Sequence, residues 1–230
     1  MLKGARVVRG WVHTDGPEGG DGHLGTVIDC SERNVTVLFD TGKERVYEAD
    51  TEDIFIYDLS PTGIVFTNKR CDGCGLNPVI GTNWKCNDCE DYDLCVRCYH
   101  AGIHDFNHVF KRMDIPGKGG VVVGSRQNAD QTRQLRGFFP GAKVMRGKHW
   151  EWGDQDGGEG CNGFVQKNYA WVGGSLGAHP GSGCQVKWER TGIEKNYRTG
   201  FQGFVDLVCT APTVGGRYYK EHLPTLGKLM

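Results

Sequence analysis

The stretch CNDCEDYDLCVRCYH, at residues 86–100, holds two Cys-x-x-Cys pairs with a run of acids between them. With an earlier Cys-x-x-Cys pair and two later histidines it forms the pattern C-x2-C-x11-C-x2-C-x5-C-x2-C-x5-H-x3-H. Eight ligands of this kind suit two tetrahedral zinc ions, one held by four thiolates and one by cysteine and histidine together. Because four protein ligands leave no open position for water, the pattern predicts two structural Zn2+ ions. The predicted ligands are Cys71, Cys74, Cys86, Cys89, Cys95, Cys98, His104 and His108.

The segment that carries these ligands is too short to bury much of an apolar core. Metal binding is therefore expected to supply its folding free energy, of order 10 kcal/mol per structural zinc. Spacing alone leaves open whether the cysteine pairs share metals sequentially or in an interleaved way. The four remaining cysteines stand singly, and single cysteines are more often small core residues than ligands. These four are Cys30, Cys161, Cys184 and Cys209.

The parts of the chain on either side of this cluster repeat each other. GARVVRG at 4–10 recurs as GAKVMRG at 141–147, and GGDGHLGTV at 19–27 recurs as GGEGCNGFV at 157–165. Two further blocks follow in the same order, which indicates a duplication into a first copy and a second copy of roughly 60 to 75 residues each.

Each copy is typical of a mostly β fold. Short β-branched runs alternate with Gly, Asp and Asn, and DTG at 40–42 is a hairpin turn signal. Short strands with tight turns in so few residues predict a small barrel that closes on itself. The Gly-rich segment 173–183 is expected to be a loop inserted in the second copy, and Val121–Val123 a short strand within a linker.

Composition and charge limit the classes of function. The chain of 230 residues has a formal net charge of -1, which argues against a general nucleic-acid binder. Residues 1–60 carry twelve acids and six bases, so this acidic region is expected either to attract a basic partner or to be ordinary solvated surface. Residues 109–140 carry six bases and two acids, which keeps nucleic-acid binding as a remote alternative. No apolar run is long enough to span a membrane, and no secretory signal is recognisable at the N-terminus.

The cysteine cluster resembles a ZZ zinc finger, and DYDLC at 91–95 is the most specific string of that family. The resemblance implies an interleaved cross-brace, with one zinc on Cys71, Cys74, Cys95 and Cys98 and the other on Cys86, Cys89, His104 and His108. ZZ fingers read proteins. The Cys-x-His step of a RING finger is missing, which argues against a ubiquitin-transfer module.

The flanking copies also resemble a known family. HWEWGDQDGGEG at 149–160 is similar to the signature of the MIB/HERC2 domain. Two such domains around a ZZ finger resemble the N-terminal region of the mind-bomb E3 ubiquitin ligases, and GGRYYKEHLPTLGK at 215–228 is nearest to the second vertebrate paralogue. The implied fold is mostly β, with two small SH3-like β-barrels that flank the ZZ finger. The expected divisions are 1–62 (first MIB/HERC2 domain), 65–114 (ZZ finger), 115–137 (linker), 138–215 (second MIB/HERC2 domain) and 216–230 (C-terminal extension).

The resemblance also implies a function. This region is expected to recognise cytoplasmic tails of Notch ligands of the Delta or Jagged type, and so to promote their ubiquitination and endocytosis. The implied location is the cytoplasm, at endosomes or near the plasma membrane. Ubiquitin transfer is expected to reside in RING fingers that are absent here, which leaves this fragment non-catalytic. A reader of free N-termini, or another adaptor without a ligase role, is the alternative. An enzyme based on the single cysteines is disfavoured because no histidine base lies near them in sequence.

Candidate binding residues are aromatic and acidic side chains, because small barrels read extended peptides with exposed aromatics beside acidic loops. In the second copy they are Trp150, Trp152, Asp154, Asp156 and Glu159, and in the first copy Trp11, Asp15 and Asp21. Packing of the aromatics into the core, and turn formation by the acids, are the alternatives. In the finger, some ZZ relatives capture a free α-amine with acids, and the matching positions are Asp72, Asp91 and Asp93. These three acids are equally well explained as hydrogen-bond supports of the zinc loops.

Overall fold

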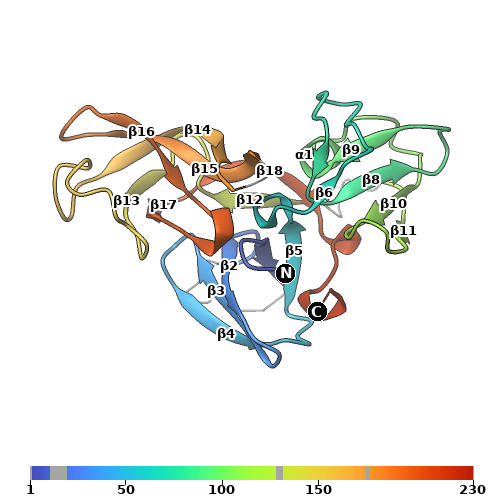
Figure 1. Cartoon of the computed structure of the whole chain (residues 1–230), viewed down its shortest axis with the longest axis horizontal. Helices are drawn as coiled ribbons and strands as arrows, with labels where there is room; N and C mark the ends of the chain where they lie inside the picture. The colour runs from blue at the N-terminus through green and yellow to red at the C-terminus, as the bar shows by residue number, and fades with distance from the viewer. Residues whose placement is uncertain (1, 11–19, 128–131, 175–176, 230) are drawn as a thin grey trace.

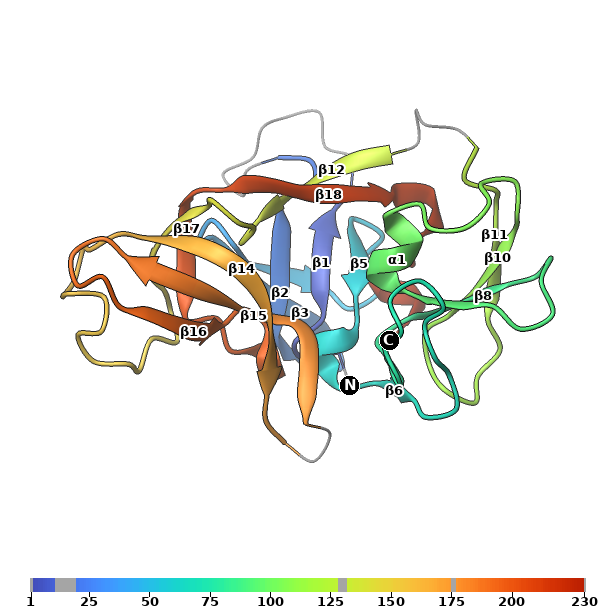
Figure 2. The same cartoon turned by 90° about the horizontal axis from the view of Figure 1, so that it is seen from above.

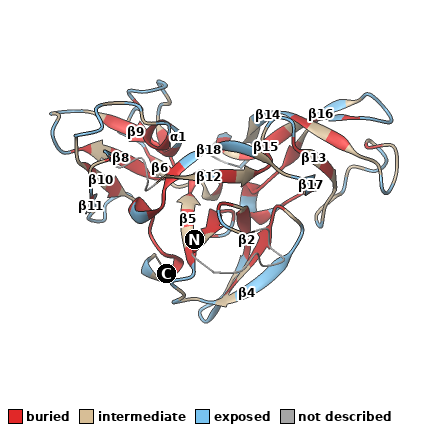
Figure 3. Cartoon of the chain, turned by 180° about the vertical axis from the view of Figure 1, so that it is seen from behind, coloured by how far each residue is buried: buried red, intermediate tan, exposed pale blue. Residues whose placement is uncertain are grey.

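The computed structural model describes residues 2–10, 20–127, 132–174 and 177–229, and it confirms a mostly β protein (Figure 1). The first copy forms one five-stranded antiparallel sheet in the order β4-β3-β2-β1-β5. Its strands are β1 (Arg6–Arg9), β2 (Leu24–Cys30), β3 (Asn34–Phe39), β4 (Glu44–Glu48) and β5 (Ile54–Asp58). Figure 3 shows that β2 is buried whereas β4, at the edge of the sheet, is exposed.

The second copy forms a sheet of the same strand order, β16-β15-β14-β13-β17. Its strands are β13 (Lys143–Arg146), β14 (Gly163–Val172), β15 (Ala178–Trp188), β16 (Glu194–Arg198) and β17 (Leu207–Ala211). Among the described residues, the two edge strands of either sheet do not pair with each other. The β content of the prediction is therefore confirmed, whereas closure into SH3-like barrels is not.

The expected loop at residues 173–183 is largely strand, which corrects the sequence interpretation. β14 and β15 extend as a hairpin in which Trp171 pairs with His179 and Val172 with Ala178. The glycines misled the prediction, because two of them, Gly181 and Gly183, belong to β15 itself. A β-carbon at Gly183 would lie only 2.9 Å from the carbonyl oxygen of Tyr197 on β16, so the close approach of the strands requires glycine here.

The metal-ligand segment lies between the two copies in sequence and forms a four-stranded sheet in the order β11-β10-β8-β9, with one short helix. The bounds are β6 (Val65–Phe66), β7 (Val79–Ile80), β8 (Asn83–Cys86), β9 (Asp93–Cys95), α1 (Val96–His100), β10 (Phe110–Met113) and β11 (Val121–Val123). The short strand expected at Val121–Val123 is present as β11. Trp84 and Tyr99 stack at the centre of this unit, with ring centroids 3.6 Å apart.

A two-stranded ribbon and a C-terminal segment connect the three units. β12 (Thr132–Gly137) pairs with β18 (Thr213–Tyr219), and Figure 2 shows the ribbon crossing from the second sheet to the finger. The C-terminal segment, residues 218–229, then returns to the first sheet, where the amide of Ile56 donates to the carbonyl of Pro224 at 2.9 Å. Short 3-10 helices complete the chain: η1 (Ser60–Thr62), η3 (Phe201–Gly203), η4 (Lys220–His222) and η5 (Leu226–Lys228).

The cores follow from the apolar faces of these strands. Val27, Val35 and Ile54 are fully buried in the first sheet, as are Val144 and Trp188 in the second. Ile28 and Leu38 of the first sheet belong to the core of the second sheet, so the two sheets pack against each other. No helix of the described residues is long and apolar enough to cross a membrane.

Candidate metal centres and binding surfaces

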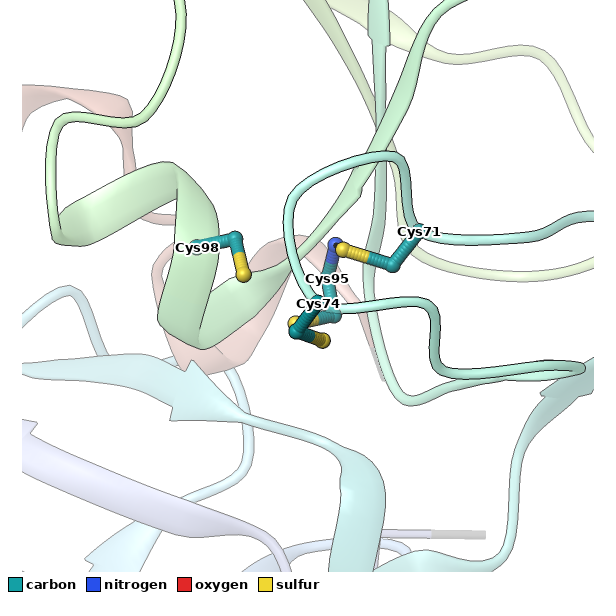
Figure 4. Close-up of side chains that lie close together, drawn as sticks. All are labelled: Cys71, Cys74, Cys95 and Cys98. Atoms are coloured by element: carbon teal, nitrogen blue, oxygen red, sulfur yellow. Dashed lines mark hydrogen bonds between the residues drawn. The ribbon is translucent and has the colours of Figure 1, made fainter.

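Four cysteines converge at the first metal centre (Figure 4). Cys71 and Cys74 come from a turn, Cys95 from the end of β9 and Cys98 from α1, and their sulfur atoms all lie within 4.8 Å of one another. The Sγ atoms of Cys74 and Cys95 are 3.8 Å apart. With Zn–S bonds of about 2.3 Å at tetrahedral angles, two sulfurs on one zinc ion lie about 3.8 Å apart. The spacing therefore fits a four-thiolate zinc site.

Two cysteines and two histidines form the second metal centre. The sulfur of Cys86 lies 3.5 Å from both His104 Nε2 and His108 Nδ1, and that of Cys89 lies 3.3 Å and 3.5 Å from the same nitrogens. Zinc bonds to sulfur and nitrogen of about 2.3 Å and 2.0–2.1 Å at tetrahedral angles place these atoms about 3.5 Å apart. The donor set and its spacing again suit one zinc ion.

Local backbone features shape the first centre. The amide of Cys95 donates to the sulfur of Cys71 at 3.2 Å, which favours the thiolate and orients it. Gly73 lies against Cys98 so closely that a β-carbon there would be 2.8 Å from its sulfur. Position 73, next to Cys74, therefore requires glycine.

The grouping answers the question that spacing alone leaves open. The first and third Cys-x-x-Cys pairs share one centre, and the second pair shares the other with the histidines, which is the interleaved arrangement. The chain therefore has two zinc sites, each with four protein ligands. Zinc bound there would supply folding free energy and cross-brace the turn, β8, β9 and α1.

The three acids of the finger lie beside Lys69. The carboxylate of Asp93 is buried and accepts from Lys69 Nζ at 2.7 Å and from Asn83 Nδ2 at 2.6 Å. Asp72 accepts from the amide of Asp93 at 2.7 Å, and Asp91 is exposed with its carboxylate 3.8 Å from Lys69 Nζ. The hydrogen bond to Asp93 is the largest cause of the raised pKa of Lys69. The acids thus support the zinc loops and also hold one ammonium group.

The two tryptophans of the second copy are partly buried. Trp150 stacks on Tyr197 with ring centroids 5.1 Å apart, and its Nε1 donates to the carbonyl of Gly153 at 2.8 Å. Trp152 donates from Nε1 to the buried carboxylate of Asp206 at 2.9 Å. Each ring therefore packs on the core of the second sheet with one side and reaches solvent with another.

The acids predicted beside these tryptophans differ in exposure. Asp156 is fully buried, and its Oδ1 lies 2.6 Å from Nη2 of Arg146. Because its carboxylate already pairs with Arg146 in the interior, Asp156 is not accessible to a ligand. Asp154 is 82% exposed, and Glu159 is exposed as well. Trp150, Trp152, Asp154 and Glu159 are called the tryptophan surface from here on.

Of the three binding residues predicted in the first copy, the structure describes one. Trp11 and Asp15 lie outside the described residues. Asp21 accepts a hydrogen bond from the hydroxyl of Tyr218 at 3.2 Å and pairs with Arg133 at 3.5 Å, so it joins the first sheet to the ribbon. Asp29 on β2 is exposed as well, and six further exposed acids lie around β3, β4 and the turn before β5. They are called the acidic rim: Glu32, Glu44, Glu48, Asp50, Glu52 and Asp53.

The sequence did not indicate that two arginines, Arg146 and Arg198, pack against the tryptophans of the second copy. The guanidinium of Arg146 lies 5.6 Å from the ring centroid of Trp150, and that of Arg198 lies 5.5 Å from that of Trp152. Arg146 belongs to the repeated block GAKVMRG, which could have drawn attention to it. Conversely, two of the six bases counted in residues 109–140 are buried: Arg112, which pairs with Asp114, and Arg126. They do not contribute to an exposed basic surface.

Comparison with known proteins bears on both regions. Residues 67–108 match the family Zinc finger, ZZ type, and residues 141–211 match Mib_herc2. The chain is 39% identical over 231 residues to E3 ubiquitin-protein ligase mind-bomb of Drosophila melanogaster, covering 98% of this chain and 18% of that protein. It is also 39% identical over 246 residues to E3 ubiquitin-protein ligase MIB2 of Gallus gallus, covering 99% of this chain and 24% of that protein. The chain thus spans less than a quarter of the length of these relatives.

A more limited similarity is found to a third ligase. E3 ubiquitin-protein ligase HERC2 of Homo sapiens is 34% identical over 71 residues, which is 31% of this chain. The solved structure entitled "Crystal structure of HERC2 ZZ domain in complex with SUMO1 tail" is 32% identical and covers 24% of this chain and 97% of that chain, with a TM-score of 0.24.

Proposed function

We propose that the chain is the substrate-recognition region of an E3 ubiquitin ligase, because nearly its whole length is similar in sequence to two mind-bomb ligases. The match to two mind-bomb relatives, with both the ZZ and the Mib_herc2 families present, is the observation that carries this proposal. Its ligand is a peptide segment of the protein to be ubiquitinated, and ubiquitin transfer belongs to other parts of the ligase. The SH3-like character of the two sheets stays part of the proposal, supported by their common strand order.

The proposed ligands are cytoplasmic tails of Notch ligands, of the Delta or Jagged type. Binding them at endosomes or the plasma-membrane periphery would promote their ubiquitination and endocytosis. Two surfaces support recognition of a peptide with basic side chains. The tryptophan surface offers two aromatic rings beside the exposed carboxylates of Asp154 and Glu159. The acidic rim has six exposed carboxylates on the other sheet, one of which, that of Glu44, pairs with Lys148.

The two surfaces act by different physical means. Aromatic side chains that are half-buried and backed by a rigid core are frequent hot spots, and truncating one commonly costs about 2 kcal/mol or more. The acidic rim instead attracts a cationic segment through solvent-exposed charges, so salt screens its contribution. A ligand with two segments would gain affinity when both are joined, because the second contact becomes intramolecular.

Reading of a free N-terminus by the finger is the second candidate function. Asp93 accepts from Lys69 Nζ at 2.7 Å and Asp91 lies 3.8 Å from it, while Asp72 accepts from the backbone amide of Asp93. The contact of one ammonium group with two of the three acids supports this candidate. A peptide α-amine would have to displace Lys69 from Asp93. Peptides with a free and an acetylated N-terminus, titrated into wild type and Lys69→Ala, separate this function from binding at the sheets.

Titration calorimetry with labelled Delta and Jagged tail peptides tests the main proposal. Trp152→Ala is expected to weaken one peptide segment by roughly thirtyfold, which corresponds to about 2 kcal/mol. Trp152→Phe keeps an aromatic ring and removes the bond to Asp206, so it separates loss of binding from loss of folding. Phe164→Ala is the matched control, because Phe164 is a partly buried aromatic of the same sheet outside the tryptophan surface. Wild-type affinity of every tail peptide for folded Trp152→Ala, or no saturable binding to wild type, would reject the proposal.

A further inference from the structure

A cavity of about 300 Å3 lies where the two sheets, the finger and the ribbon meet. Arg6, Leu24 and Tyr57 line it from the first sheet, Phe138 from the segment after β12, and Arg97 from α1. Figure 2 shows α1 facing β5 and β18 in the middle of the molecule. None of the residues named so far as a zinc ligand, or as part of the tryptophan surface or the acidic rim, lines this cavity.

A second cavity, of about 350 Å3, adjoins the first. Arg97, Asn168 and Gly181 line both cavities, so the two form one continuous groove. The far part of the groove lies between the finger, which contributes Leu76, Asn77, Pro78 and Ile80, and the extended β14–β15 hairpin. The insertion in the second copy therefore builds part of this groove.

Two cations of the groove are available to a ligand. The side chains of Arg97 and Arg217 are exposed, and neither forms an ion pair with a carboxylate of the described residues. Arg6, by contrast, pairs with Asp40 at 2.7 Å. The one acid that lines the groove, Asp58, is buried, and its Oδ1 accepts from both the amide and the hydroxyl of Ser60.

The remaining lining combines apolar walls with polar side chains, among which Asn168 is suited to a peptide backbone. Leu24, Tyr57, Phe138 and Phe139 form an apolar floor next to the arginines. Asn168 donates from Nδ2 to the carbonyl of Phe138 at 2.8 Å, which leaves its Oδ1 to accept an N–H from a ligand backbone. An apolar pocket with a few convergent polar groups has the character of a ligand site.

We propose that this groove binds an extended segment of a partner protein in which an apolar side chain stands next to an aspartate or glutamate. The apolar side chain fills the cavity beside Phe138 and Phe139, and the carboxylate pairs with Arg97 and Arg217. Charge-assisted pairs between arginine and carboxylate are strong and directional, and they discriminate against cationic segments. The groove thus selects a sequence of opposite charge to the basic segment proposed for the other two surfaces, and it does not depend on that proposal.

Selection from random peptides tests the groove without assuming a partner. Phage-displayed peptides of about twelve residues are selected on the zinc-loaded chain and counter-selected on the double variant Arg97→Glu/Arg217→Glu. Enriched peptides are expected to carry an acid beside a large apolar residue. In calorimetry, Arg97→Glu in the protein, or glutamine for that acid in the peptide, is then expected to weaken binding at least tenfold.

Arg70→Glu is the matched control, since Arg70 is also an exposed arginine of the finger, changes the charge equally and lies outside the groove. It is expected to bind the selected peptides as wild type does. Zinc content and melting temperature verify that each variant is folded. The proposal is overturned if no selected peptide depends on Arg97, if the dependent peptides are basic, or if Trp152→Ala abolishes their binding as strongly as Arg97→Glu does.

Discussion

The two five-stranded sheets share their backbone pattern down to single hydrogen bonds. The amide of Gly4 donates to the carbonyl of Val27 at 2.8 Å, and at the matching place the amide of Gly141 donates to the carbonyl of Val165 at 2.8 Å. Both first strands carry a register shift at the same position of the repeat, between Arg6 and Val7 and between the equivalent Lys143 and Val144. The duplication has therefore kept strand order, register and irregularities together.

The sheets differ in where they bury charge. In the first sheet Arg6 pairs with Asp40, whereas in the second Arg198 pairs with Asp206 at 2.7 Å, at a position that does not correspond in the repeat. In the second sheet Arg146 also pairs with the buried Asp156, at 2.6 Å. The pattern of apolar residues that sets the sheet has thus been retained, while the buried ion pairs of Arg6 and Arg198 stand at different positions of the repeat.

Removal of zinc is expected to have the largest effect, and it tests whether the two sheets stay folded when the finger beside them unfolds. Chelation, or Cys86→Ser, should unfold the finger, since structural zinc supplies of order 10 kcal/mol per ion. Both sheets should survive on their apolar cores. Hydrogen exchange checks this: the amides of Val27 and Val165, bonded to Ala5 and Ala142, should stay protected while those of β8 and β10 exchange.

Cys184→Ala is the control for the zinc experiment, because Cys184 is a buried cysteine of the second core and not a ligand. It should leave the zinc content at two ions per chain. Loss of protection in one sheet only would break the equivalence of the two copies. Protection of the finger after complete metal removal would contradict its dependence on zinc.

Neutralising one buried acid in each sheet is the next largest change. Asp206→Asn removes the buried carboxylate that pairs with Arg198 and leaves that guanidinium only the exposed carboxylate of Glu151. It also replaces the charged acceptor of Trp152, so a loss of about 3–5 kcal/mol in the free energy of unfolding is expected. Asp40→Asn should cost a similar amount through Arg6. Urea unfolding measures both. Glu151→Gln is the matched control, because this acid is 58% exposed and its ion pair with Arg198 should contribute under about 1 kcal/mol.

Salt should distinguish the two sheets as binding surfaces. Contacts of a basic peptide with the acidic rim are between exposed charges, so raising the ionic strength from about 0.01 M to 0.15 M shortens the Debye length from about 30 Å to 8 Å. Affinity for that segment is expected to fall about tenfold, or 1.4 kcal/mol, whereas the segment on the tryptophan surface should change less. Calorimetry of each segment, and of both joined, measures this. Equal salt dependence of the two segments would contradict the division between them.

Much of this molecule could be predicted from its residues. Metal ligands occur at characteristic spacings in the sequence, so the eight zinc ligands and the number of zinc ions they bind were predictable. The β-strands of the two copies were predictable from the repeated β-branched runs. The pairing of the ligands was not predictable from spacing, because it depends on β8 bringing Cys86 next to His104 and His108 rather than next to Cys95. Burial of Asp156 was equally inaccessible, since nothing in its Gly/Asp-rich surroundings shows that Arg146 reaches it from β13.

The outer edges of the two sheets provide the last contrast. The C-terminal segment covers β5, where Ile56 bonds Pro224, whereas the equivalent β17 is bonded by the first sheet itself, from the amide of Cys209 to the carbonyl of Asp40 at 2.7 Å. His222 anchors the C-terminal segment: its Nδ1 lies 2.7 Å from the hydroxyl of Tyr99, and its carbonyl accepts from Arg112. The first sheet is therefore the one whose edge depends on a histidine.

Mild acid should weaken the His222 anchor, and this is the smallest of the expected effects. Burial lowers the pKa of His222 to about 4, helped by the surrounding cations Arg126 and Arg112. The unfolded chain binds this proton near pH 6.5 and the folded chain does not, so stability is present above pH 6.5 and is lost as the pH falls toward 4. Between pH 7.5 and 6.0 this one group should cost about 0.8 kcal/mol. His222→Gln can still accept from Tyr99 and does not titrate, so urea unfolding should show a smaller loss for it. An equal loss in both proteins would mean that His222 has the same protonation state in the folded and the unfolded chain. The edge of the first sheet would then have no acid-sensitive anchor.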